Sequence, residues 1–177
     1  SLFQASLSVI DQFMVGQLGE ASISAIAFGG KFMGILTFTI FAISSTASIM
    51  MAQYIGNKEK KGVNKAFSFN LYIGLIVAVI FFVLSFFFAK PIISIYTSDD
   101  SVIPLGVSYL SIISFNVFPI LGGALLNAYL QNNNRSYLTM IAGLFSVICN
   151  TLLNWLFIFG FKAIPAMGVS GAALATL

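Results

Sequence analysis

The residue in this sequence whose type and position most directly suggest chemistry is Asp11, which lies within an apolar run at the start of the chain. The nearest cation in the sequence is Lys31. If the run is helical, Gln4, Ser8 and Asp11 share one face, because they follow each other at spacings of four and three. A charged carboxylate in hydrocarbon costs on the order of several kcal/mol unless it is paired, protonated or hydrated. We therefore predict that Asp11 is functional and that Gln4 and Ser8 line a cavity beside it.

The composition shows that this environment is a membrane. Apolar residues make up 59% of the 177 residues and charged residues only 7%, whereas a soluble domain carries about 25% charged residues. A helix needs roughly 20 apolar residues to cross a hydrocarbon core about 30 Å thick. Uncharged runs of that length or more cover residues 32–57, 66–89, 101–134 and 136–161. The sequence predicts an all-α, polytopic bundle of transmembrane helices embedded in the lipid bilayer.

The apolar runs and the loops between them predict six helices. These cover about residues 1–15, 32–54, 66–89, 104–129, 137–159 and 168–177. We also expect a short interfacial helix within residues 21–30, a polar loop from Pro91 through the letters TSDDS, and a kink at Pro119. Because the chain starts and stops inside apolar runs, we interpret it as a piece of a longer protein with truncated first and last helices.

The charged loops predict the orientation of these helices. The loops after the second and fourth helices carry five of the eight Lys and Arg residues, namely Lys58, Lys60, Lys61, Lys65 and Arg135. The positive-inside rule places these two loops in the cytoplasm. A specific site for anionic lipid in the lysine-rich loop is the alternative interpretation. The net charge of +3 is explained by these positions, so nucleic-acid binding is not expected.

In this orientation, polar groups of three helices fall at similar depths in the outer half of the membrane. Asn150 and Asn154 lie four residues apart on one helical face, Ser146 continues that face, and Thr176 belongs to the last helix. Together with Asp11 these groups supply hard oxygen ligands, which can hold a small cation, or a proton shared by the aspartate and an asparagine. The alternative is that the asparagines and the threonine only join helices through hydrogen bonds.

Several kinds of chemistry are disfavoured by what the sequence contains. It has no His and a single Cys, which leaves little scope for general-base catalysis, common metal sites or a disulfide framework. No Asp-rich metal motif lies inside a predicted span. We therefore expect neither an enzyme nor a cofactor, and no metal beyond a possible sodium ion at Asp11.

Four stretches of the chain resemble the multidrug and toxic compound extrusion (MATE) transporters. The first-helix signature of that family is similar to VIDQFMVGQLG, and its helix 2–3 loop to AQYIGNKEKKGVNKA. Its helix 4–5 junction resembles LLNAYLQNNNRSYLTM, and its helix 5–6 region resembles NTLLNWLFIFGF followed by MGVSGAALAT. The resemblance implies twelve helices in two six-helix lobes. Residues 1–177 would form most of the N-terminal lobe, with the C-terminal lobe as its partner.

The resemblance also implies a function. MATE transporters export drugs or other organic cations across the cell membrane, here a bacterial inner membrane, in exchange for sodium ions or protons. It assigns Asp11, Asn150 and Thr176 to the coupling site, and Asn154 stands where many members carry a second aspartate. The alternative is a lipid-linked oligosaccharide flippase of the same fold superfamily. A pyrophosphate lipid requires cationic residues, and the first, third, fourth and fifth predicted helices contain none.

We predict that the loops 56–65 and 131–136 are cytoplasmic and that the loops 98–101 and 161–167 are external. In intact cells, Lys60→Cys in the full-length protein should resist a membrane-impermeant maleimide, while Ser98→Cys should react with it. The reason is the excess of basic residues in the first pair of loops. Labelling of Lys60→Cys from outside would reverse the orientation.

Overall fold

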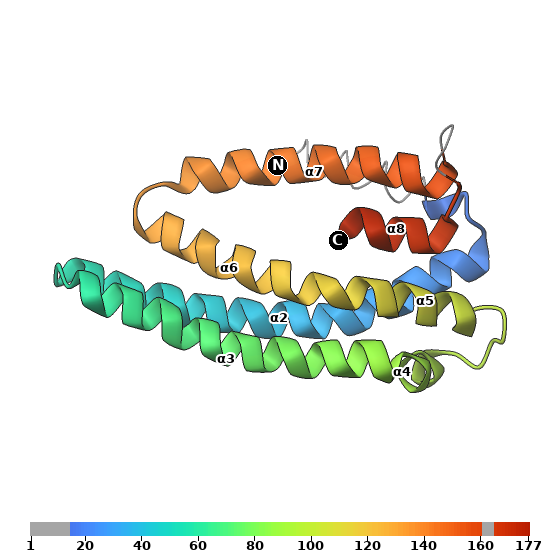
Figure 1. Cartoon of the computed structure of the whole chain (residues 1–177), viewed down its shortest axis with the longest axis horizontal. Coiled ribbons are helices and arrows are strands. Elements are labelled where there is room, and N and C mark those ends of the chain that lie inside the picture. Colours follow the sequence, from blue (N-terminus) through green and yellow to red (C-terminus); the bar gives the residue numbers. More distant parts are fainter. Residues whose placement is uncertain (1–14, 161–164) are drawn as a thin grey trace.

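The computed structural model describes residues 15–160 and 165–177, and the regular structure of this part is entirely helical (Figure 1). The elements are α2 (Glu20–Gly56), α3 (Lys60–Phe87), α4 (Ala89–Tyr96), α5 (Ile103–Ile113), the 3-10 segment η1 (Ser114–Asn116), α6 (Val117–Asn132), α7 (Ser136–Phe159) and α8 (Gly168–Thr176). Within the described residues, four stretches are long and apolar enough to cross a membrane: α2, α3, α5 through α6, and α7. Most of the helix predicted for residues 1–15 lies outside the described ranges.

The second helix is longer than predicted. It runs without a break from Glu20 to Gly56, over 37 residues, so the separate interfacial helix expected within residues 21–30 is wrong. Two consecutive glycines, Gly29 and Gly30, disfavour a helix on propensity alone. Gly29 is nevertheless buried where another helix approaches closely, since a Cβ atom there would lie 2.6 Å from Cδ1 of Tyr109. Tertiary packing therefore explains the helix that local propensity disfavours.

The loop predicted to begin at Pro91 is also wrong in its first half. Residues Ala89–Tyr96 form α4, whose buried residues include Ile92 and Ile93. Pro91 is tolerated because it lies in the first turn, where a backbone N–H would have no partner within the helix. The non-helical connection to α5 covers only residues 97–102.

The predicted kink at Pro119 corresponds to an interruption of the third membrane-length stretch, between α5 and α6. The backbone tightens into η1, over Ser114–Asn116, between α5 and α6. Pro119 provides no N–H for the carbonyl of Phe115, and its ring crowds that carbonyl, which explains a break just before the proline. The last two helices, α7 and α8, lie within one residue of the predicted bounds.

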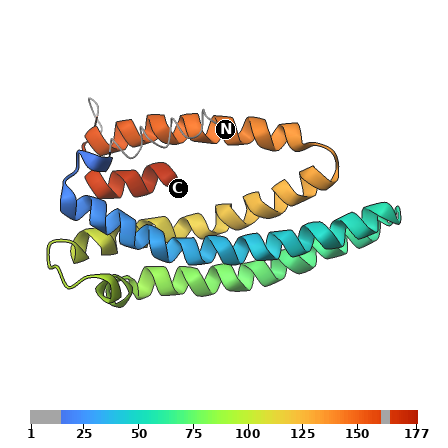
Figure 2. The same cartoon turned by 180° about the vertical axis from the view of Figure 1, so that it is seen from behind.

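The helices form two layers that meet at one end (Figures 1 and 2). The first contains α2, α3 and the α5–α6 stretch, which pack against one another. In the second, α7 runs back beside α6 and diverges from it, and α8 lies between α7 and α5. The α2–α3 and α6–α7 turns share one end of the bundle, and the α4–α5 loop lies at the other.

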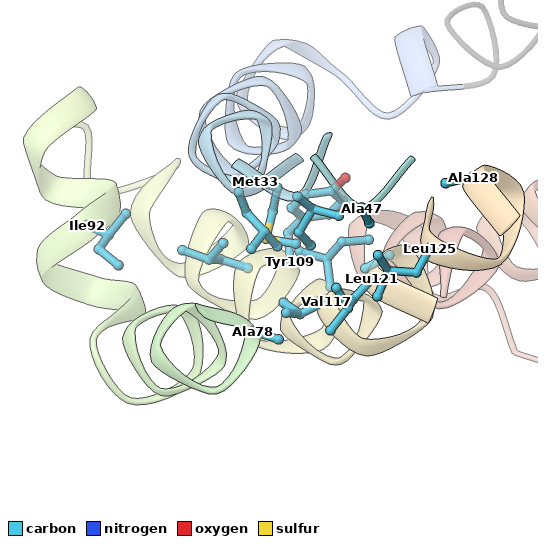
Figure 3. Packing of buried hydrophobic residues seen from close by; sticks show 14 of the residues in the cluster. Met33, Ala47, Ala78, Ile92, Tyr109, Val117, Leu121, Leu125 and Ala128 are labelled. Carbon is cyan, nitrogen blue, oxygen red and sulfur yellow. The ribbon is translucent and has the colours of Figure 1, made fainter. Parts of the chain in front are cut away.

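Most of the hydrophobic core belongs to the first layer, and α4 and α8 add a few residues to it. Figure 3 shows Met33 of α2, Tyr109 of α5 and Leu121 and Leu125 of α6 within this cluster. Only two residues of α7 are buried, Asn154 and Ile158. In α8, by contrast, five of nine residues are buried, so α7 is the least buried of the four membrane-length stretches.

We predict that two adjacent glycines of α2 respond oppositely to substitution. Gly29→Ala should lower the free energy of unfolding by about 1–3 kcal/mol, because the new methyl group overlaps the buried ring of Tyr109. Gly30→Ala should raise it by up to about 1 kcal/mol, since a Cβ there meets nothing within 4 Å and alanine favours the helix. Thermal unfolding of the purified full-length protein measures both. Equal shifts in one direction would contradict the packing at Gly29.

Candidate functional site

A cavity of about 600 Å³ lies where the two layers meet. Its wall is formed by residues that precede α2, by the first two turns of α2, and by side chains of α5, α7 and α8. The lining residues are Val15, Gly16, Ile23, Ile26, Ala27, Tyr109, Asn150, Asn154, Ala172 and Thr176. Three of the polar ones come from α7 and α8, so those two helices give the cavity most of its hydrogen-bonding capacity.

Two asparagines one turn apart on α7 connect this helix to α8. The Nδ2 atom of Asn150 donates a hydrogen bond to the carbonyl oxygen of Ala175, at 3.0 Å. The Nδ2 atom of Asn154 donates in turn to Oδ1 of Asn150, at 3.2 Å. The hydrogen bonds thus run in one direction, from Asn154 through Asn150 to the backbone of α8.

The residue at which these hydrogen bonds begin, Asn154, has an oxygen without a hydrogen-bond partner in the described part of the chain. Asn154 is only 5% exposed, and its Oδ1 atom is buried and accepts no hydrogen bond from the described residues. Leaving a buried acceptor unpaired costs about 1–3 kcal/mol. The oxygen therefore favours any group that brings it a proton donor or a positive charge.

The end of α8 contributes a hydroxyl group to the cavity and a hydrogen bond to η1, the segment between α5 and α6. The Oγ1 atom of Thr176 donates to the carbonyl of Ala172, at 2.9 Å, which leaves its lone pairs free to accept. The carbonyl oxygen of Thr176 accepts a hydrogen bond of 3.2 Å from Nδ2 of Asn116, in η1. The interruption between α5 and α6 is thereby hydrogen-bonded to the end of α8, where Thr176 lines the cavity.

The side chains around this cavity suit a cation or a protonated group better than an anion. The amide oxygens and the hydroxyl group are acceptors of the kind that hard cations prefer, and no lysine or arginine is among the lining residues. Among the described residues there is also no group of three or more His, Cys, Asp and Glu able to hold a metal ion. Neutral oxygens alone offset a buried positive charge poorly, so such a site needs a carboxylate.

The structure brings together some of the residues selected from the sequence. Asn150, Asn154 and Thr176 line one cavity. Ser146, on the same helical face, is exposed and is not among the lining residues. Asp11 and the two residues placed beside it, Gln4 and Ser8, lie outside the described residues.

Several parts of the site are not predicted by the sequence. Tyr109 is an aromatic residue in an apolar helix, and nothing in its local pattern distinguishes it from a core residue. Asn116 offered a signal, since it is an amide inside a long apolar run just before Pro119. The part of the cavity wall formed by Ile23, Ile26 and Ala27 is not predicted, because the sequence places residues 21–30 in an interfacial helix at the membrane surface.

Comparison with known proteins shows a consistent set of relatives. The chain is 27% identical over 176 residues to a probable multidrug resistance protein NorM of Bacillus cereus, covering 99% of the chain and 38% of that relative. A probable NorM of Rhizobium meliloti is 27% identical over 179 residues, again with 99% and 38% covered. The chain therefore spans about 38% of the length of these relatives.

Solved structures show the same fold. A crystal structure of MATE in complex with MaD5 superimposes with a TM-score of 0.87 at 21% identity, covering 98% of this chain and 38% of that one. An inward-facing structure of a multidrug resistance MATE family transporter of the MOP superfamily gives a TM-score of 0.82 at 24% identity, with the same coverage.

The family itself is shown by a match that extends over most of the chain. The MatE family model matches residues 1–156. The described helices agree with it, since four stretches among them are able to span a membrane. The resemblance noted in the sequence is confirmed: this chain belongs to the MatE family of multi-pass membrane transporters.

Proposed function

We propose that this chain forms most of the N-terminal lobe of a secondary active transporter, which exports drugs or other organic cations in exchange for sodium ions or protons. The observation that carries the proposal is the unpaired, buried oxygen of Asn154, in a cavity shared with Asn150 and Thr176. The names of the relatives, probable multidrug resistance proteins, support the assignment of the substrate class.

In this proposal Asp11 supplies the negative charge that the cavity needs. Val15 follows Asp11 by four residues in the sequence and lines the cavity. A helix over residues 1–15, as the sequence predicts, would place the two residues one turn apart on the same face. The carboxylate would then act together with the neutral oxygens of Asn150, Asn154 and Thr176.

Two coupling ions fit this set of groups. A sodium ion would be held by the carboxylate and the uncharged oxygens of α7 and α8. A proton would instead reside on Asp11, and the protonated carboxyl group would donate a hydrogen bond to Oδ1 of Asn154. In both cases the charge of Asp11 is offset and the unpaired oxygen gains a partner, so the two ions would favour the same state of the lobe.

Hydrogen bonds around the cavity would connect the binding of the ion or proton to the rest of the lobe. Asn150 connects the site to the backbone of α8, and Asn116 connects the end of α8 to η1. Occupancy of the site would bias the position of α7 and α8 against the more firmly packed first layer. Alternating access then follows from a shift of population between two arrangements of the lobe.

No observation favours the lipid-linked oligosaccharide flippase as a second candidate. Binding a pyrophosphate calls for cationic side chains, and the lining of the cavity where the two layers meet contains no lysine or arginine. The chain spans about 38% of the relatives, and the rest of their length is sufficient for a second lobe, which would complete the path of the substrate.

The proposal predicts that Asp11→Asn abolishes coupling without unfolding the protein. Ion-driven efflux by the full-length protein in proteoliposomes should fall at least about tenfold, the effect of losing roughly 1.4 kcal/mol of coupling free energy. Thermal stability should change by less than about 1 kcal/mol, because burying a neutral amide costs less than burying a carboxylate.

The matched control is Asp99→Asn, which removes one carboxylate from an exposed loop. This variant should transport like the wild type. A folded Asp11→Asn variant with wild-type efflux would refute the proposed role of Asp11.

A further inference from the structure

A second cavity, of about 650 Å³, lies at the opposite end of the bundle from the α4–α5 loop. It is bounded by the end of α2, the α2–α3 turn, the start of α3 and the end of α6. Its lining residues are Ile55, Lys58, Glu59, Lys60, Val63, Asn64, Tyr129 and Asn133. It shares none of these with the first cavity, so it calls for a separate explanation.

The charge around this cavity is strongly positive. Lys58 and Lys60 are exposed and belong to its lining, whereas Lys61 and Lys65 are exposed on α3 and do not. In the two turns at this end, residues 56–65 and 131–136, there are five Lys or Arg residues and one acid, Glu59. Such an excess attracts anions to the cavity.

The backbone of one of these lysines is held in an unfavourable conformation. Lys58 has φ = 58°, in the left-handed region that favours glycine or asparagine after a helix. The turn is fixed by hydrogen bonds from the backbone N–H of Lys58 to the carbonyl of Ile55, at 3.0 Å, and from that of Glu59 to the carbonyl of Tyr54, at 2.9 Å. A lysine at such a position, with its side chain on a cavity, suggests that the side chain is needed there.

The remaining walls place the cavity at the level of lipid headgroups. Ile55, Val63 and Tyr129 supply an apolar floor, and the ring of Tyr129 packs edge-on against Phe67, with centroids 6.1 Å apart. Tyrosines and lysines at the ends of membrane-length helices are typical of the interface between hydrocarbon and water. Just beyond this level, α3 continues with exposed apolar side chains such as Phe69.

We propose that this cavity binds the headgroup of an anionic phospholipid. Lys58 and Lys60 would contact the phosphate group, Asn64 would offer a hydrogen bond, and the apolar floor would lie under the glycerol backbone. An anionic membrane lipid matches all three features of the cavity: its positive charge, its depth at the membrane interface and its apolar floor. This inference is independent of the proposed transport activity, because it concerns other residues at the other end of the bundle.

The test compares two double substitutions that remove the same charge from the same region. The thermal midpoint of the purified full-length protein is measured in detergent with added phosphatidylglycerol or phosphatidylcholine. Phosphatidylglycerol should raise the midpoint of the wild type by about 3 °C relative to phosphatidylcholine. Lys61→Gln/Lys65→Gln should keep this shift, and Lys58→Gln/Lys60→Gln should lose it.

A third variant separates lipid binding from folding. Lys58→Gly should raise the midpoint without lipid, since glycine favours the left-handed backbone, and it should reduce the shift caused by phosphatidylglycerol. Equal loss of the shift in both double variants would show diffuse surface attraction and overturn the site. An equal shift produced by glycerol phosphate, at the same concentration, would show a site for free anions and overturn the assignment to lipid.

Discussion

A buried amide oxygen without a hydrogen-bond donor is the constraint around which the candidate site is organised. The hydrocarbon of a membrane supplies no donor to such a group, so the oxygen of Asn154 takes its partner from the protein, from a bound ion or from water in the cavity. Its own Nδ2 group is committed to Asn150, and that of Asn150 to the backbone of α8. Both bonds use amide N–H groups as donors, which leaves Oδ1 of Asn154 as a buried acceptor in a residue that lines the cavity.

The uneven packing of the lobe is suited to this arrangement. The first layer holds most of the apolar core, and Gly29 and Tyr109 show how closely its helices approach each other. The second layer contains only two buried residues in α7, one of them Asn154. Hydrogen bonds tie the end of α8 to two other elements: Asn150 of α7 donates to the carbonyl of Ala175, and Asn116 of η1 donates to the carbonyl of Thr176.

Much of this could be predicted from the sequence, for reasons that can be named. Long apolar runs predict α7 and most of α3. The four-residue spacing of Asn150 and Asn154 predicts a shared helical face, and both residues line the cavity that Thr176 of α8 also lines. The failures arose where tertiary contacts override local preference. Gly29 allows Tyr109 to approach closely, and the Gly29–Gly30 pair does not end α2. Pro91 lies in the first turn of α4 and does not prevent that helix. Tyr109 packs against Gly29 and lines the cavity because α2 lies opposite α5, and the local sequence does not show which helix lies opposite.

The most direct test of the proposed site is a double-mutant cycle on Asp11 and Asn154, read from the pH and sodium dependence of transport by the full-length protein. Asn154→Asp would add a second carboxylate, and two carboxylates in one low-dielectric site cannot both stay charged cheaply, so the pair should bind a proton or a cation more readily. We predict a shifted pH optimum or a stronger sodium dependence for Asn154→Asp alone, and a much smaller effect in the Asp11→Asn background. If the effects of the two substitutions simply add, Asn154 is a packing residue and the two side chains do not share a site.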